Sequence, residues 1–403
     1  MFNHYNRNVM KIRILLIISV VMLICACDKQ SAQKLNIRTD IPLTAAQKTM
    51  VSGNNDFAFD LYNNLSDGKS LFISPLSAAY ELSILANGVD GDTRNEILTA
   101  LGLENKDMSG FNEYAQMMRT RLLKMDKTSE LRISNMIVSN SISGSLNGDY
   151  KNLCSKYYAC DVAEMDFSGG RSVVDYVNNF CSRSTSGKVP MILESVNSND
   201  VMYALNAVYF KGQWANPFIT GDTRKSSFTN SDGRQTNVDM MHVTEFFEYA
   251  ELSGTRAIVL PYGNGAFRMT VIVSDHTPLL ADWKEINSSV RRIYVDYRMP
   301  KFETGQVLQI ENALKSMGVK TLFSDTADFS PMTDAEEMEV SGIRQVSWFR
   351  LDEKGSEAAS VSVNAGPTAP GIEAIFTVDR PFTYVISEVS TGAILFMGYY
   401  SGL

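Results

Sequence analysis

The chain has 403 residues, of which 44% are hydrophobic and 20% are charged, and its formal net charge at pH 7 is -8. This composition is typical of a folded chain that buries a sizeable core, and it argues against disorder. The negative charge argues against nucleic acid as a partner, because phosphate binding needs a basic surface. No proline-, glycine- or serine-rich linker divides the interior, so we expect one large domain.

The first segment has the features of an export signal. Lys11 and Arg13 precede an apolar run at 14–24, which ends in the small and cysteine residues of 25–27. Such a charged region, apolar region and small-residue end predict a signal peptide at 1–26. The apolar run is too short for a comfortable membrane span.

Cys27 closes a sequence, ICAC at 24–27, that resembles a bacterial lipobox. The resemblance implies that the Cys27 thiol is acylated and becomes the first residue of the mature chain. A plain secretory signal is the alternative. Residues 27–45 are polar and lack sustained periodicity, which predicts a tether. We therefore expect an exported protein that is lipid-anchored to a bacterial membrane, either in the periplasm or at the cell surface.

A helix is predicted after this tether. Ser74 and Pro75 supply an N-cap and a first-turn proline. Apolar residues at 82, 85, 86 and 89 then fall at the spacing of one buried helix face. Gly88 and Gly91 end the helix.

Thr93 and Glu96 form a capping-box pattern, which predicts that a second helix starts at Thr93 and runs to a stop at Gly102. Apolar periodicity predicts two further helices. They contain Val173, Val177, Phe180 and Cys181, and Val307, Ile310, Leu314 and Met317 before Gly318.

Three cysteines lie inside the predicted domain, at Cys154, Cys160 and Cys181. An odd number without CxxC spacing is a poor disulfide framework and a poor metal site. We interpret the three side chains as buried structural thiols.

Strands are predicted mainly in the second half of the chain. Residues 201–210 are nearly continuously apolar, which is typical of a strand that is covered on both faces. Other segments are rich in β-branched and aromatic residues; they are 267–273, 293–297, 346–351, 382–386 and 393–400. Because no βαβ alternation appears, we predict an α+β fold with mainly antiparallel sheets.

Enzyme motifs are scarce. The sequence contains no GxSxG, HExxH, P-loop or complete GxGxxG motif. His242 and His276 are the histidines that remain after signal removal, and each is a conceivable general base in a lipid-anchored hydrolase. Neither accompanies a nucleophile motif, so we favour surface or core-edge roles for both. We predict no catalytic residue, no cofactor and no metal site.

One long segment is unusual for a compact domain. Residues 355–371 are small and weakly polar throughout and lie between two predicted strands. A loop of this length is usually functional or disordered. Ser356, Ala358, Ser360 and Ser362 are small and share one parity, whereas Glu357 has the other parity. In a strand these two sets face opposite sides, so the segment is able to enter a sheet with its small residues buried.

Two motifs resemble the serpin family. Residues 352–359, DEKGSEAA, resemble the reactive-loop hinge, and residues 206–214, NAVYFKGQW, resemble the central-strand signature. Further blocks are similar to serpin blocks: FISPLS at 72–77, TSGKV at 185–189, MPKF at 299–302, ADFS at 327–330, and DRPF at 379–382 followed by LFMG at 395–398. The resemblance predicts a serpin domain at 46–403 with a reactive-centre loop at about 353–375.

The resemblance implies a fold and a function. We expect helices that pack around a large mixed, mainly antiparallel sheet and smaller sheets, with an exposed reactive-centre loop. A serpin of the inhibitory type is a suicide inhibitor of serine or cysteine endopeptidases, which traps the acyl-enzyme as a covalent complex by inserting the cleaved loop into the main sheet. We expect a monomer. A non-inhibitory serpin that acts as a binding or carrier module is the alternative.

The resemblance also assigns site residues. The hinge comprises Glu353, Gly355, Ser356, Glu357, Ala358, Ala359 and Ser360. The strand-opening region comprises Ser74, Ser77, Asn206 and Gln345, where Gln345 replaces the histidine of the family. Glu353 and Lys301 are expected to pair at the top of the sheet, with Trp214 near them. The hinge positions that insertion would bury are small and uncharged, which favours the inhibitory type.

The bond that a protease cleaves is placed by counting. Counting from Glu353 reaches Ala369, whereas counting back from Pro381 gives a position one residue later. Because a proline after the bond makes a poor substrate, we favour Thr368–Ala369 and keep Ala369–Pro370 as the alternative. Small residues here suit elastase-like or subtilisin-like proteases.

Overall fold

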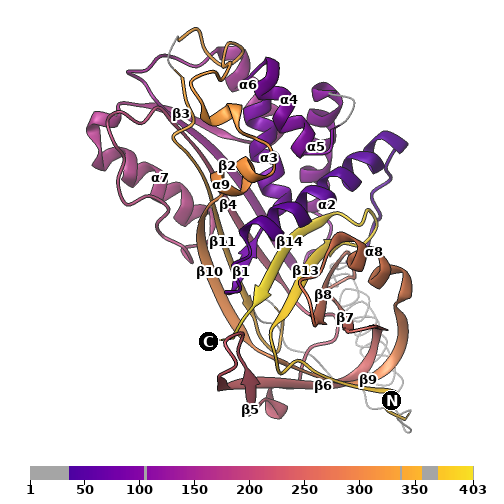
Figure 1. The fold of residues 1–403 in the computed structure, drawn as a ribbon. Coiled ribbons are helices and arrows are strands. Elements are labelled where there is room, and N and C mark those ends of the chain that lie inside the picture. The colour runs from indigo at the N-terminus through magenta and orange to yellow at the C-terminus, as the bar shows by residue number, and fades with distance from the viewer. Residues whose placement is uncertain (1–35, 104–106, 336–337, 356–370, 403) are drawn as a thin grey trace, which may run out of the picture. The chain divides into compact units, whose positions relative to one another are not determined.

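The computed structural model describes residues 36–103, 107–335, 338–355 and 371–402. The chain divides into two units, 1–37 and 38–403, and the second unit contains all the described helices and strands (Figure 1). Within the described ranges, no helix has the length and apolar character that crossing a membrane would require.

A five-stranded sheet carries the end of the predicted hinge. Its strand order is β10-β11-β4-β2-β3. The bounds are β10 (Phe302–Gln309), β11 (Gly342–Leu351), β4 (Met202–Gly212), β2 (Ser129–Asn140) and β3 (Asp161–Met165). β10 and β2 pair antiparallel with β11 and β4, whereas β11 pairs parallel with β4 and β2 pairs parallel with β3.

The second sheet has nine strands in the order β1-β14-β13-β8-β7-β6-β9-β12, with β5 paired to β6. The bounds are β1 (Leu71–Ile73), β14 (Ile394–Tyr400), β13 (Phe382–Glu388), β8 (Phe267–Ser274), β7 (Thr255–Pro261), β6 (Gln235–Leu252), β9 (Arg291–Pro300), β12 (Ala374–Thr377) and β5 (Arg224–Thr229). Only β12 and β9 form a parallel pair among them.

Eight α-helices of the described chain surround these sheets. They are α2 (Ala45–Leu65), α3 (Pro75–Ala86), α4 (Gly91–Ala100), α5 (Met108–Leu122), α6 (Gly148–Tyr158), α7 (Arg171–Ser184), α8 (Leu280–Ser289) and α9 (Glu311–Ser316). The predicted α+β class is therefore confirmed.

The apolar run of β4 is covered on both faces, as predicted. Leu205 and Ala207 belong to the smaller core, which contains the buried residues of α7, whereas Ala204 and Val208 belong to the larger core, which contains α3. Figure 1 shows α7 on one side of this sheet and α3 on the other. All twelve residues of α3 are buried, so this helix is enclosed rather than amphipathic.

The predicted capping box at Thr93 and Glu96 is wrong, because α4 begins two residues earlier, after Asp90. Both side chains bind distant backbone groups instead. Thr93 Oγ1 accepts from the Asp328 N–H at 3.1 Å, and Glu96 Oε2 accepts from the Lys320 N–H at 2.7 Å. These tertiary partners outweigh the local pattern.

The helix predicted over 307–317 is wrong in its first half. Val307 lies in β10, where its side chain is 41% exposed, and the helix α9 covers only Glu311–Ser316. Alternation along a half-exposed strand had produced part of the apolar spacing.

The three cysteines of the domain, Cys154, Cys160 and Cys181, are buried and form no disulfide with described residues. Burial raises the pKa of the Cys154 and Cys181 thiols to about 12. They are packing residues with little thiolate character.

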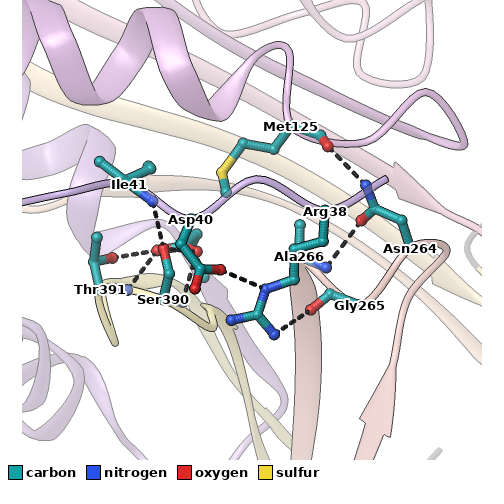
Figure 2. A network of polar contacts seen from close by, with 10 residues as sticks. Arg38, Asp40, Ile41, Met125, Asn264, Gly265, Ala266, Ser390 and Thr391 are labelled. Atoms are coloured by element: carbon teal, nitrogen blue, oxygen red, sulfur yellow. Dashed lines mark hydrogen bonds and ion pairs between the residues drawn. The ribbon is translucent and has the colours of Figure 1, made fainter. Parts of the chain in front are cut away.

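The chain from Arg38 to α2 is fastened to the domain (Figure 2). Ile41 is 5% exposed, and its N–H donates to Ser390 Oγ at 2.9 Å. The Arg38 guanidinium donates to the Gly265 carbonyl at 3.4 Å and pairs with Asp40 at 2.8 Å. The last part of the segment interpreted as a tether therefore lies against the turns that follow β7 and β13.

Candidate functional site: hinge and strand-opening region

A tight turn ends β11 and starts the predicted hinge. The Asp352 N–H donates to the Gly355 carbonyl at 2.9 Å, and the Gly355 N–H donates back at 3.2 Å. Gly355 has φ +124°, and a Cβ there would lie 2.2 Å from the Gly212 carbonyl oxygen. Only glycine fits this position, and the turn sends the chain back toward the top of β4.

Residues 356–370 lie outside the described residues. The hinge residues Ser356, Glu357, Ala358, Ala359 and Ser360 and both candidate bonds, Thr368–Ala369 and Ala369–Pro370, belong to this segment. Glu353 and Gly355 are the hinge residues that the structure describes.

Glu353 is held in a buried cluster at the top of β11, where it is 7% exposed. Its Oε1 accepts from Thr223 Oγ1 at 2.7 Å and from Lys301 Nζ at 3.3 Å. Burial alone would raise the pKa of Glu353, but these hydrogen bonds and the lysine charge outweigh it and hold the pKa below its usual value. The Lys301–Glu353 ion pair is therefore partly buried rather than a fully exposed surface pair.

Trp214 lies beside the same turn. Its Nε1–H donates to the Asp352 carbonyl at 3.0 Å, and its backbone N–H donates to the Lys354 carbonyl at 3.0 Å. The indole stacks on Tyr262 with ring centroids 4.4 Å apart. Glu353, Lys301 and Trp214 thus form one group that fixes where the loop leaves the sheet.

A chain of buried amides crosses the middle of the five-stranded sheet. Gln345 of β11 lies opposite Asn206 of β4, and Gln345 Nε2 is 3.5 Å from Asn206 Oδ1. Asn206 Nδ2 donates to Asn135 Oδ1 of β2 at 2.7 Å. Each of these side chains is at most 1% exposed, so the three strands share one polar connection inside an apolar interior.

Gln345 also binds the start of α3. Its Oε1 accepts from the Ser74 N–H at 2.8 Å, and its Nε2 donates to the Ser74 carbonyl at 2.9 Å. The Ser74 hydroxyl donates to the Leu395 carbonyl of β14 at 2.8 Å rather than capping the helix. Ser77 Oγ is buried and has no hydrogen-bond partner among the described residues. The glutamine therefore ties β11 to the helix beneath it.

Sequence reasoning missed three residues of this site. Asn135 completes the amide chain, Thr223 binds Glu353, and Ser347 Oγ donates to the Phe72 carbonyl at 2.6 Å. A polar residue in a buried strand would have marked Asn135, but the strand that contains it was not predicted. Nothing in the sequence marks Thr223.

Neither histidine belongs to this region. His242 of β6 has Nε2 3.2 Å from Asp296. His276 follows β8, where its ring nitrogens lie 3.1 Å from Ser274 Oγ and 3.1 Å from Asp282 Oδ2. Ser274 also accepts from the His276 backbone N–H, and Asp282 also accepts from the Leu279 N–H, so both contacts belong to local turn and cap structures.

The comparisons with known proteins agree with this arrangement. Residues 52–402 match the family described as serpin (serine protease inhibitor). The chain belongs to the serpin family, whose members are mostly protease inhibitors and are not enzymes.

The chain is similar to curated relatives that are named as inhibitors, as neuroserpins and as thyroxine-binding globulins. Intracellular coagulation inhibitor 1 of Tachypleus tridentatus is 28% identical over 87% of this chain and 88% of its own length, and human neuroserpin is 27% identical over 85% and 89%. Thyroxine-binding globulin of Bos taurus is 28% identical over 95% and 97%.

Solved serpin structures share the fold. The native state of the thermophilic serpin tengpin matches with a TM-score of 0.82 and 24% identity, over 91% of this chain and 96% of that one. Human thyroxine-binding globulin in complex with thyroxine matches with a TM-score of 0.80 and 27% identity, over 88% of this chain and 98% of that one.

Proposed function

We propose that this chain inhibits serine endopeptidases by offering its loop as a substrate and then inserting the cleaved loop between β11 and β4. The supporting observation is the parallel pairing of β11 with β4 in a sheet where β10 and β2 pair antiparallel with them. A strand that returns from the end of β11 is antiparallel to β11 and to β4 alike. It therefore completes regular antiparallel ladders on both sides.

The hinge turn supplies a register for that strand. Continuing the pairing of Asp352 with Gly355 sets Ser360 opposite Ser347 and Ser362 opposite Gln345. Residues that are directly opposite share one face of a sheet. The small residues would thus face the larger core, which contains α3, and Glu357 would face outward opposite Arg350, which is exposed.

The trap begins with ordinary acyl transfer. The protease serine attacks the carbonyl carbon of Thr368, the bond to the Ala369 nitrogen breaks, and the amine leaves with the proton that the serine gave to the protease histidine. The loop is then joined to the protease by an ester. Because the new end is free, the loop carries the protease along as it enters the sheet.

Insertion provides enough free energy to stop the enzyme. The protease is joined to Thr368, so the 13 residues of 356–368 at about 3.3 Å each move it on the order of 40 Å. At about 1 kcal/mol net per hydrogen bond, the added strand contributes on the order of 10–15 kcal/mol, which is comparable to the stability of a domain. Loss of one oxyanion-hole donor slows catalysis about 10²–10³-fold, so deacylation stalls.

Incubation with proteases tests the proposal. Pancreatic elastase and subtilisin should each give an adduct that survives SDS, with the mass of the protease plus the chain up to Thr368. Mass spectrometry of the released C-terminal fragment should place its first residue at Ala369. Cleavage outside 365–371, or cleavage with no adduct for either enzyme, would contradict the proposal.

A carrier function is the second candidate, and one cavity favours it. A hollow of about 440 Å³ lies between α2 and α8, lined among others by Asn55, Arg268, Trp283 and Asn287. Thyroxine-binding globulin is named for a small ligand. A carrier would bind a small apolar anion while its loop is cleaved without forming an adduct, so the same incubation separates the two functions.

We further propose that residues 1–26 direct export, that Cys27 is acylated, and that the lipid anchors the domain to a bacterial membrane in the periplasm or at the cell surface. The support is the signal pattern together with ICAC at 24–27. Full-length protein expressed in a bacterium should partition into the detergent phase of Triton X-114, and Cys27→Ala should move it to the aqueous phase. Equal partition of wild type and Cys27→Ala would contradict the lipid anchor.

A further inference from the structure

A strip of apolar and aromatic side chains, exposed at Phe246 and Ile375 and half-buried at Tyr294, crosses three strands beside the end of the loop. Phe246 of β6 lies opposite Tyr294 of β9, with ring centroids 5.1 Å apart. Ile375 of β12 lies opposite Asp296, two residues from Tyr294 on the same face. We call Ile375, Tyr294 and Phe246 the β12 strip.

The strip faces away from the core. The alternating residues Phe247, Val295 and Phe376 are at most 2% exposed, whereas Phe246 is 37% and Ile375 is 62% exposed. Strands at a sheet edge ordinarily carry charges that discourage contact. β12 is the last strand on its side of the described sheet and instead presents an isoleucine. Such a patch is typical of an interaction site.

A basic hollow continues the strip beyond Phe246. Its volume is about 290 Å³, and its lining includes Arg38, Arg268, Arg292 and the single acid Glu248. The Arg292 guanidinium lies 5.4 Å from the centre of the Phe246 ring. Arg38 is the residue that Figure 2 shows reaching Gly265. Three arginines stand against Glu248 and against Asp40, the ion-pair partner of Arg38. The remaining positive charge favours a carboxylate, which guanidinium groups bind with charge-assisted hydrogen bonds.

Arg268 gives the hollow a fixed cationic wall. Its side chain is 17% exposed and lies 3.6 Å from Glu248 Oε2. Its NH2 group donates to Asn287 Oδ1 at 2.5 Å. A guanidinium that neighbours already orient loses little side-chain entropy when a partner binds.

We propose that the β12 strip and this hollow form a docking surface for the target protease, with apolar protease surface on the strip and an acidic protease side chain in the hollow. The proposal rests on the inhibitory function. Ile375 follows Ala369 by six residues, which span at most about 20 Å. One side of a standard interface covers about 800 Å², a disc about 16 Å in radius. A protease that holds the loop is therefore brought against the strip, whose arginine and aromatic content is typical of binding hot spots.

The test measures encounter separately from trapping. Elastase and subtilisin, each with its catalytic serine replaced by alanine, are bound to the full chain and to Phe246→Ala and Arg292→Glu. The matched controls are Leu123→Ala, whose side chain is 39% exposed at the end of α5, and Lys124→Glu beside it. Active proteases then give the rate of adduct formation and the stoichiometry.

We expect Phe246→Ala and Arg292→Glu each to raise the Kd by about tenfold or more and to slow adduct formation by the same factor. The stoichiometry and the two controls should be unchanged. If wild type is cleaved without an adduct, the inhibitory function fails, and the Kd comparison still decides the docking surface. Equal Kd values for variants and controls, or no binding of either inactive protease to wild type, would overturn the docking surface.

Discussion

Gln345 and Asn206 face each other across the one parallel pair at the centre of the five-stranded sheet, and their side-chain amides are 3.5 Å apart. That distance is at the long limit for a hydrogen bond, so the contact is weak. The stronger bonds of each residue run elsewhere, from Gln345 to Ser74 and from Asn206 to Asn135. An entering strand would break the weakest link in this polar chain.

Gln345→Ala should destabilise the intact chain, because the buried Ser74 N–H loses its partner, whereas the Ser74 carbonyl loses one hydrogen bond and still accepts from the Ala78 N–H. Leaving a buried N–H unpaired costs about 1–3 kcal/mol. Urea unfolding measures the loss. Gln345→His retains a donor and an acceptor and serves as the conservative variant. An unchanged transition midpoint for Gln345→Ala would show that Ser74 does not depend on the glutamine.

Ser356→Arg should convert the inhibitor into a substrate. Its side chain has the parity that the proposed register buries, and burying a charge there opposes insertion. Glu357→Arg is the matched control, because the same residue type is placed on the outward parity. Titration against elastase should show many molecules of Ser356→Arg cleaved per enzyme inactivated, and an almost unchanged ratio for the control. Equal ratios would contradict the register.

Glu353→Gln should remove a pH-dependent part of the stability. The pKa of Glu353 is lowered in the folded chain, so its contribution is present above the ordinary value of 4.5 and is lost as the pH falls through the folded pKa. We expect wild type to exceed the variant in melting temperature at pH 7 and the two curves to converge toward pH 3. A constant difference across this range would assign the effect to packing alone.

Glu81 should make the stability depend on pH in the opposite direction to Glu353. Its carboxyl is 1% exposed in α3, and neither oxygen has a hydrogen-bond partner among the described residues. Burial, with the charge of Glu311, raises its pKa well above the ordinary 4.5, so stability falls as the pH rises from that value. The slope is up to about 1.4 kcal/mol per pH unit. The melting temperature of Glu81→Gln should therefore rise relative to that of wild type between pH 5 and 8. A constant difference in melting temperature over this range would refute the assignment.

The sequence predicted best what depends on local pattern and burial. The apolar run at 201–210 correctly indicated a strand covered on both faces, because two helices of the same domain bury it. The capping box at Thr93 failed because Glu96 binds Lys320, more than two hundred residues away. Local patterns cannot reveal such partners.

The site was only partly predictable. The resemblance named Gln345, Asn206, Glu353 and Lys301 but not Asn135. Identifying Asn135 as the partner of Asn206 required the register between β2 and β4, which long-range pairing sets. The parallel pairing of β11 with β4, on which the proposed mechanism depends, is likewise a tertiary property.

Calorimetry of the intact chain and of the chain nicked in its loop by a catalytic amount of elastase tests the central claim most directly. The inserted strand should raise the melting temperature of the nicked molecule well above that of the intact one, because it adds two antiparallel ladders to the five-stranded sheet. A nicked molecule that melts at or below the temperature of the intact one would contradict the account.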